Sequence, residues 1–138
     1  MTIKRYTKQL VSNEYDAFMD KQCLNICNAI NLIKGIKTTE SCCGHNRNRF
    51  RIWLTCDINY IRNINIISKA LNRRYGGPSN NDNNEWVCSV YFSDRNSCLG
   101  KNHKIIVFCI ESFYKGRKAY WEANKIAKNI KDILKRGY

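Results

Sequence analysis

Hydrophobic residues recur at helical spacing in three segments of the chain. The first begins near Asn13, carries acidic residues in its first turns, where the helix dipole favours negative charge, and ends at Gly35. The second follows Asp57, a typical N-cap residue, and the third covers about 115–136. The three buried stripes are expected to contain Met19, Cys23, Ile26, Cys27, Ile30 and Ile33, then Ile58, Ile61, Ile64, Ile67 and Leu71, then Ala119, Ala123, Ile126, Ala127, Ile130, Ile133 and Leu134.

Alternation with a period of two predicts strands between these helices. Two hairpins are expected, one closed by the polar segment 42–48 and the other by 94–102. In the second strand of the first hairpin, apolar and polar residues alternate as in a strand with one buried side. The apolar face holds Phe50, Ile52, Leu54 and Cys56, and the other face Arg49, Arg51, Trp53 and Thr55. The predicted strands are 1–8, 36–41, 49–56, 85–93 and 104–113.

The elements follow the order β, α, β, β, α, β, β, α. Because the strands come in hairpins rather than in βαβ units, the sequence predicts the α+β class, with a mainly antiparallel sheet of two hairpins and three helices on one face. A chain of 138 residues is long enough to bury a core of its own, so we expect one compact domain, 1–138. The Asn-rich segment 76–84 is expected to form a mobile loop.

Charge is the broadest indication of function. The chain has 24 Lys and Arg against 11 Asp and Glu, a formal net charge of +13. Such a surface attracts nucleic acid or phosphorylated small molecules. No run of about 20 apolar residues is present to span a membrane, and the first ten residues lack the apolar run of a secretory signal. We therefore expect a cytoplasmic protein with no membrane partner.

Eight cysteines lie within apolar patterns rather than at the spacings of a small secreted scaffold, so we expect reduced thiols. Cys42, Cys43 and His45, with Cys56 or His103, are residue types that zinc accepts. Their spacing is not that of a zinc site, and adjacent cysteines point apart on a strand. No metal site and no cofactor are predicted.

The same residues raise the question of catalysis by a cysteine nucleophile. A thiolate needs a histidine beside it and an orienting group, and Cys42 or Cys43 with His45 and either Glu40 or Glu111 supplies these types. Buried cysteine is common in cytosolic cores, which favours the packing interpretation. We predict no catalytic residue, and whether the protein is an enzyme stays open, with a binding role preferred.

The segment around the first hairpin turn is the candidate ligand site. Gly44 permits a close approach, and backbone amides beside it can converge on an anion while the following arginines supply charge. Two guanidinium groups next to an indole on one strand face suit a phosphate beside a stacked base, although the indole can equally lie in the core. The predicted ligand-binding residues are Ser41, Gly44, His45, Arg47, Arg49, Arg51 and Trp53.

The run 38–45, Thr-Thr-Glu-Ser-Cys-Cys-Gly-His, follows a helix and precedes a basic strand. It resembles the Thr-Thr-Ser-Ser-Cys-Ser-Gly-Arg signature of the tRNA wybutosine-synthesis methyltransferase-like family, and it is similar to small phage and prophage proteins with Glu-Ser-Cys-Cys-Gly-His at this place. The resemblance covers about 20–54 and implies an α/β domain with a nucleotide or nucleic-acid ligand near the hairpin. Glu40, Cys43 and His45 depart from the signature, so the family's catalytic capacity does not carry over.

Three functions follow from these residues. The first is non-catalytic binding and sequestration of a small phosphorylated nucleotide, such as a cyclic nucleotide or an ADP-ribose-type signal, in the manner of phage counter-defence. It favours a homo-oligomer, because a short chain encloses a charged ligand more easily at an interface. The second is RNA binding or tRNA modification, with the arginines tracking phosphates. The third is a basic inhibitor that occupies the site of a nucleic-acid enzyme.

Overall fold

The computed structural model of the chain describes residues 20–72, 86–90 and 105–137, and the fold is given for these residues. They form a four-stranded antiparallel sheet with three α-helices, which confirms the α+β class. The strands are β1 (Ile36–Cys42), β2 (Arg51–Asp57), β3 (Trp86–Val90) and β4 (Ile105–Ser112). The α-helices are α2 (Leu24–Ile30), α3 (Ile64–Asn72) and α4 (Arg117–Lys135), and short 3-10 helices are η1 (Lys21–Cys23), η2 (Gly44–Asn46) and η3 (Ile58–Asn63).

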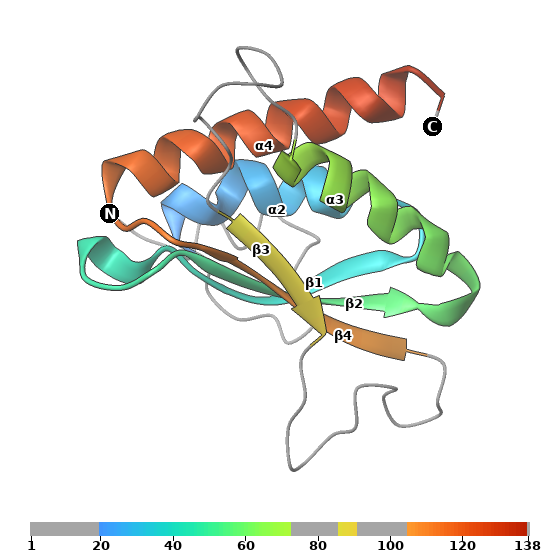
Figure 1. The fold of residues 1–138 in the computed structure, drawn as a ribbon, viewed down its shortest axis with the longest axis horizontal. Helices are drawn as coiled ribbons and strands as arrows, with labels where there is room; N and C mark the ends of the chain where they lie inside the picture. The colour runs from blue at the N-terminus through green and yellow to red at the C-terminus, as the bar shows by residue number, and fades with distance from the viewer. Residues whose placement is uncertain (1–19, 73–85, 91–104, 138) are drawn as a thin grey trace.

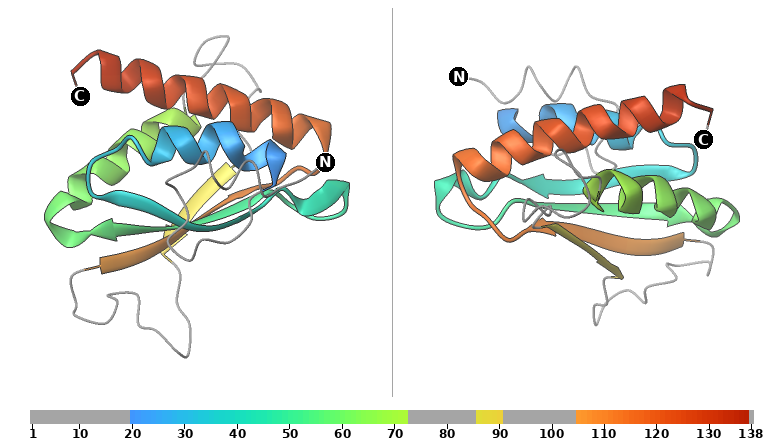
Figure 2. Two further views of the ribbon diagram at one scale, coloured as in Figure 1. Left: turned by 180° about the vertical axis from the view of Figure 1, so that it is seen from behind. Right: turned by 45° about the horizontal axis from the view of Figure 1, so that its top comes forward.

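The strand order in the sheet is β1-β2-β4-β3. Both predicted hairpin pairs are antiparallel neighbours, and β2 joins them by pairing with β4, with Arg51 opposite Glu111 and Cys56 opposite Ile106. The three helices lie together on one side of the sheet, with α4 running across the layer (Figures 1 and 2). The predicted strand 1–8, the start of the first helix and the loop 76–84 lie outside the described residues.

The core lies between the helix layer and one face of the sheet. Strand β2 alternates buried and less buried residues as the sequence predicts: Ile52, Leu54 and Cys56 are fully buried, as is Phe50, which directly precedes the strand. The predicted stripe of the first helix is also buried from Cys23 to Ile33. The helix itself is shorter than predicted within the described residues, since a 3-10 turn precedes α2 and Ile33 follows its end.

The second predicted helix differs in its first turns. Asp57 caps it as expected, accepting a hydrogen bond from the Asn59 amide at 2.8 Å. The chain then forms η3 rather than an α-helix, so side chains repeat about every three residues instead of every 3.6. Ile58 and Ile61, which the α-helical spacing placed in the core, are therefore exposed, and Ile67 and Leu71 of α3 are buried as predicted.

A side-chain clamp joins the end of α2 to the start of β1. Asn31 Nδ2 donates to the Cys27 carbonyl at 2.7 Å and to Thr38 Oγ1 at 2.8 Å, and Asn31 Oδ1 accepts from the Thr38 amide at 3.0 Å. Between them, Gly35 adopts a φ of +85°, and a Cβ atom there would lie 2.4 Å from Cβ of Tyr60. Only glycine fits this turn without displacing the chain.

Three aromatic rings hold the sheet edge to α4. Phe50, fully buried, lies 5.3 Å from the ring of Trp86 and 6.1 Å from that of Tyr120 between centroids. Trp86 Nε1 donates to the buried carboxylate of Glu122 at 2.9 Å. This cluster fixes the first turn of α4 above the start of β2, where the candidate site lies. No helix of the described ranges is long and apolar enough to cross a membrane.

Candidate nucleotide-binding groove

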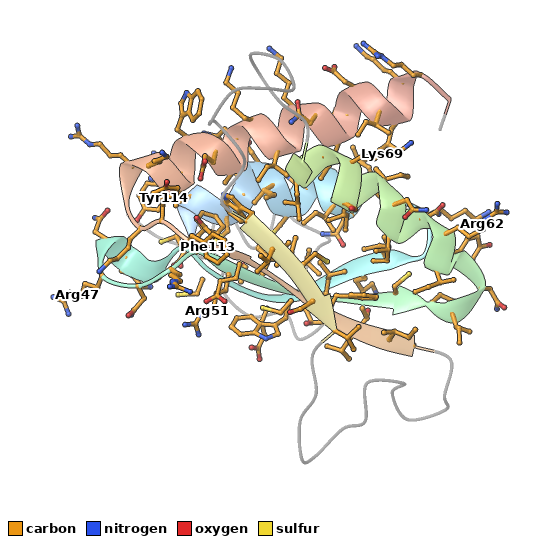
Figure 3. All side chains as sticks on the ribbon, in the orientation of Figure 1. Arg47, Arg51, Arg62, Lys69, Phe113 and Tyr114 are labelled. Atoms are coloured by element: carbon orange, nitrogen blue, oxygen red, sulfur yellow. The ribbon has the colours of Figure 1, made fainter. Side chains whose placement is uncertain are left out.

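An open groove of about 370 Å³ lies where β2 begins and β4 ends. We call it the basic groove. It is positioned by three segments: the loop between η2 and β2, the facing ends of β2 and β4, and the connection from β4 to α4. Figure 3 shows Arg47, Arg51 and Phe113 at this end of the molecule, with Arg62 and Lys69 at the opposite end. The lining residues are Arg47, Asn48, Arg49, Arg51, Glu111, Phe113 and Lys115.

Four cations and one carboxylate line the basic groove. Arg51 Nε donates to Glu111 Oε2 at 2.8 Å, so the arginine in the strand is partnered. Arg49 lies over the ring of Phe113, with its guanidinium carbon 5.6 Å from the ring centre. Phe113 is 46% exposed although it is a large apolar side chain. The groove therefore combines an excess of positive charge with an accessible aromatic ring.

The structure brings together only some of the predicted ligand-binding residues. Arg47, Arg49 and Arg51 all line the basic groove. Trp53 lies two residues beyond Arg51 on the same sheet face, opposite Glu40 and Cys109, and is not among the lining residues. The aromatic ring next to the arginines is Phe113 instead.

Ser41, Gly44 and His45 are not among the residues that line the groove. Ser41 pairs with Ile52, which puts its side chain on the core face of the sheet near the thiols of Cys23 and Cys27. Burial raises the pKa of both thiols, to about 12 for Cys27, so these cysteines are neutral packing residues at ordinary pH. Gly44 is buried and begins η2, and His45 is exposed.

The backbone amides of the turn donate within the chain. The Cys43 amide donates to Asp20 Oδ2 at 2.9 Å, the Gly44 amide to Cys42 Sγ at 3.4 Å, and the His45 amide to Cys43 Sγ at 3.4 Å. The Cys43 amide is therefore paired with the carboxylate of Asp20, and the other two amides are paired with cysteine sulfurs.

Asp20 also faces the side chains of the turn. Its Oδ2 lies 3.5 Å from His45 Nε2, and His45 Nδ1 lies 3.9 Å from Cys43 Sγ. Tyr120 donates its hydroxyl to the same sulfur at 3.8 Å. Burial raises the pKa of Cys43 and of Tyr120. We call Asp20, Cys43 and His45 the Asp-Cys-His cluster. Cys56, an earlier candidate partner, pairs with Ile36 at the other end of β1, and His103 lies outside the described residues.

A second basic surface runs along the outer side of α4. Lys118 lies 4.0 Å from the ring centre of Tyr114, and Lys125 lies 5.4 Å from that of Trp121. Trp121 is 54% exposed. Spacings of three and four residues place Lys118, Trp121 and Lys125 along one side of α4, and Tyr114 lies in the connection that precedes the helix.

Sequence reasoning missed Asn48, Phe113 and Lys115 in the basic groove and Asp20 beside the turn. The sequence does indicate that Phe113 could be exposed. It directly follows an apolar strand and precedes a basic helix, so it lies in a connection rather than in a buried segment. Glu111 was considered only as an orienting group. Its approach to Arg51 follows from the pairing of β2 with β4, which local pattern does not encode.

Comparison of the chain with protein-family models, with curated proteins and with solved structures found no match. The resemblance to the wybutosine-synthesis family therefore stays a prediction, and the function is argued from the site.

Proposed function

We propose that the basic groove binds a small phosphorylated nucleotide. The observation that carries this proposal is the placement of an exposed aromatic ring, Phe113, among cations that include Arg47 and Lys115. Guanidinium and ammonium groups recognise phosphate oxygens, and an accessible ring offers a surface on which a base stacks. The two halves of a nucleotide thus have separate partners in one groove.

The size and charge of the groove support a ligand of nucleotide scale. Its volume of about 370 Å³ falls within the range of small-molecule sites, about 300–1,000 Å³. Glu111 is the one carboxylate among the described lining residues, and Arg51 holds it at 2.8 Å, which limits its repulsion of a phosphate. Because the groove is open, a ligand on one chain keeps a face uncovered. A second copy of the chain would cover it, and we propose a homo-oligomer.

Binding without turnover is the role that this lining favours. Its residues are three arginines, one lysine, one asparagine, one phenylalanine and Glu111, which is tied to Arg51. Among the described residues the lining has no histidine, cysteine or hydroxyl group, so it supplies positioning and charge rather than a nucleophile. We therefore propose sequestration of a nucleotide signal, of the cyclic or ADP-ribose type, as in counter-defence by a phage.

Native mass spectrometry of the purified protein, after incubation with a mixture of cyclic dinucleotides, cyclic ADP-ribose isomers and mononucleotides, tests the proposal. We expect one chemically intact nucleotide per groove, released unchanged on denaturation, on an oligomer. Phe113→Ala should weaken affinity by about 1–3 kcal/mol, the usual worth of a stacked base. Arg47→Ala should weaken it as well.

Arg62→Ala is the matched control, because Arg62 is also an exposed arginine but lies at the opposite end of the molecule (Figure 3). Equal losses in Arg47→Ala and Arg62→Ala would reduce the effect to net charge and contradict the groove. A chemically altered ligand would contradict the non-catalytic role.

Binding of single-stranded RNA is the second candidate function. The Tyr114–Lys118 pair at the start of α4 and the Trp121–Lys125 pair on it favour this function, since alternating rings and cations suit stacked bases and their phosphates. It predicts a steep fall of affinity with salt and a loss in Trp121→Ala that exceeds the loss in Phe113→Ala. The opposite ranking of these two variants favours the basic groove and a small ligand.

A further inference from the structure

The Asp-Cys-His cluster brings three metal-ligating side chains to one point. One ligand atom from each of Asp20, Cys43 and His45 lies within 4.8 Å of the other two. Cys43 directly follows β1 and His45 lies two residues further on, inside η2, whereas Asp20 precedes η1. The tertiary fold is needed to bring Asp20 to the other two residues, which is why sequence spacing does not reveal the cluster.

The distances suit a small tetrahedral ion. With zinc bonds of about 2.3 Å to sulfur and 2.0–2.1 Å to nitrogen or oxygen, ligand atoms of a tetrahedral site lie roughly 3.3–3.7 Å apart. His45 Nε2 lies 3.5 Å from Asp20 Oδ2, whereas the 3.9 Å contact with Cys43 Sγ is made by the other ring nitrogen, Nδ1. One ion binds only one of these nitrogens, so binding requires the side chains to rotate until that nitrogen, the sulfur and one carboxylate oxygen surround it.

Hydrogen bonds around the cluster match those around bound metals. Cys43 Sγ accepts from the His45 amide and from the Tyr120 hydroxyl, and Asp20 Oδ2 accepts from the Cys43 amide. Donors of this kind stabilise a metal-bound thiolate and orient a carboxylate ligand. His45 reaches the cluster through a left-handed backbone conformation with a φ of 52°, which is unfavourable for a residue with a side chain.

A cysteine-nucleophile relay uses the same three residue types, but its geometry differs. In a relay the imidazole stands between the sulfur and the carboxylate and holds them apart. His45 does contact the sulfur through Nδ1 and the carboxylate through Nε2, but the sulfur and a carboxylate oxygen are also within 4.8 Å of each other, so the ring does not hold them apart. Cys43 is also only 5% exposed, covered by the Tyr120 hydroxyl, whereas 64% of the His45 side chain faces solvent. The histidine is therefore open to solvent, whereas the sulfur is poorly accessible to a substrate.

We infer that Asp20, Cys43 and His45 form a zinc site with three protein ligands and a fourth position open to solvent. Binding converts the Cys43 thiol to a thiolate, with the proton released to solvent, and the ion joins the start of η1 to η2. Arg47 and Asn48 follow η2 directly and line the basic groove, so the ion would fix the loop that carries them. The inference stands independently of what the groove binds.

The test is a zinc titration of the full chain, stripped with a chelator, against a chromophoric competitor, together with optical spectra after addition of Co²⁺. We expect one zinc per chain and a sulfur-to-cobalt charge-transfer band. His45→Gln and Cys43→Ser should lower zinc affinity by more than roughly 100-fold. Loss of a residue that only hydrogen-bonds to a metal ligand already lowers metal affinity by about 10–100-fold, and loss of a ligand should cost more. Circular dichroism checks that each variant is folded.

Two matched controls separate this site from adventitious binding by the other thiols and by the second histidine. Cys42→Ser changes the adjacent cysteine, which pairs with Arg51 and lies on the same sheet face as that arginine, and His103→Gln changes the other histidine. Both should keep wild-type affinity. A wild-type protein without stoichiometric zinc, or equal losses in Cys42→Ser and Cys43→Ser, would overturn the inference. If a ligand variant fails to fold, the cobalt spectrum of the wild type still decides, since absence of the thiolate band contradicts the site.

Discussion

Arg51 and Glu111 form an ion pair across β2 and β4, with Nε and Oε2 2.8 Å apart, inside a groove that otherwise has an excess of positive charge. The pair has a double effect on an anionic ligand. Arg51 is engaged with Glu111 and is less available to the ligand. Glu111, the one carboxylate among the described lining residues, is in turn engaged with Arg51 and does not pair with the other cations, which stay available.

Glu111→Gln should therefore strengthen nucleotide binding in the basic groove. The change releases Arg51 and removes the negative charge. Exposed ion pairs are worth about 0.2–1 kcal/mol, so we expect a gain of at most about fivefold in affinity, measured by isothermal titration calorimetry. Glu40→Gln is the control, because it removes an equal charge from the same sheet face outside the groove. Weaker binding in Glu111→Gln would mean that the carboxylate itself contacts the ligand.

Gly35→Ala should strongly destabilise the fold. The added Cβ would lie 2.4 Å from Tyr60 Cβ, on a backbone with a φ of +85°. Together the clash and the left-handed conformation should lower the free energy of unfolding by about 2–4 kcal/mol in urea denaturation. Gly137→Ala is matched in backbone, with a φ of +79°, but its Cβ would meet nothing within 4 Å. Equal effects of the two substitutions would show that the contact with Tyr60 is unimportant.

Trp86→Phe should destabilise the protein through its partner Glu122. The indole Nε1 donates to the Glu122 carboxylate at 2.9 Å, and Glu122 is only 4% exposed. Removing the donor leaves a buried carboxylate oxygen without that bond, which should cost about 1–3 kcal/mol of unfolding free energy by thermal or urea denaturation. The same change at exposed Trp121 should stay within about 0.5 kcal/mol. A loss at Trp121 as large as that at Trp86 would contradict this account.

Stability should fall as pH rises above 9, in part through Cys27. Burial raises the pKa of this thiol from 9.0 to about 12, so between these values the folded protein keeps a proton that the unfolded chain releases. Its stabilising contribution is complete below pH 9 and is lost as pH rises toward 12, with a slope of at most about 1.4 kcal/mol per pH unit. Unfolding free energies of wild type and Cys27→Ala at several pH values from 8 to 11 check this. Subtracting the curves cancels Lys and Tyr ionisation, and parallel curves would refute the prediction.

The sequence predicts those parts of the fold in which neighbouring residues decide the structure. The alternation around Phe50 and Ile52 identified both the strand and its buried side, and the stripe from Ala119 to Ile130 identified the long helix. It failed at Ile58 and Ile61, because a 3-10 turn and an α-turn share the same N-cap and differ only in how the following residues pack.

The candidate site was predictable only in its contiguous part. Arg47, Arg49 and Arg51 follow one another along the chain, so their common location could be read from the pattern. Phe113 reaches them because β2 pairs with β4, and Asp20 reaches Cys43 because α2 is folded back on β1. Both contacts depend on long-range topology, and no local preference of these residues encodes it.

The carboxamide of Asn31 has a consequence for how freely this chain can vary. It donates to the Cys27 carbonyl and Thr38 hydroxyl and accepts from the Thr38 amide. Aspartate has the right length but lacks the donors, and glutamine has the donors but is one methylene too long. Of the twenty amino acids, asparagine alone satisfies this junction. The same junction can therefore be searched for in other chains by its sequence pattern: an asparagine at a helix end and a threonine seven positions later, near the start of a strand.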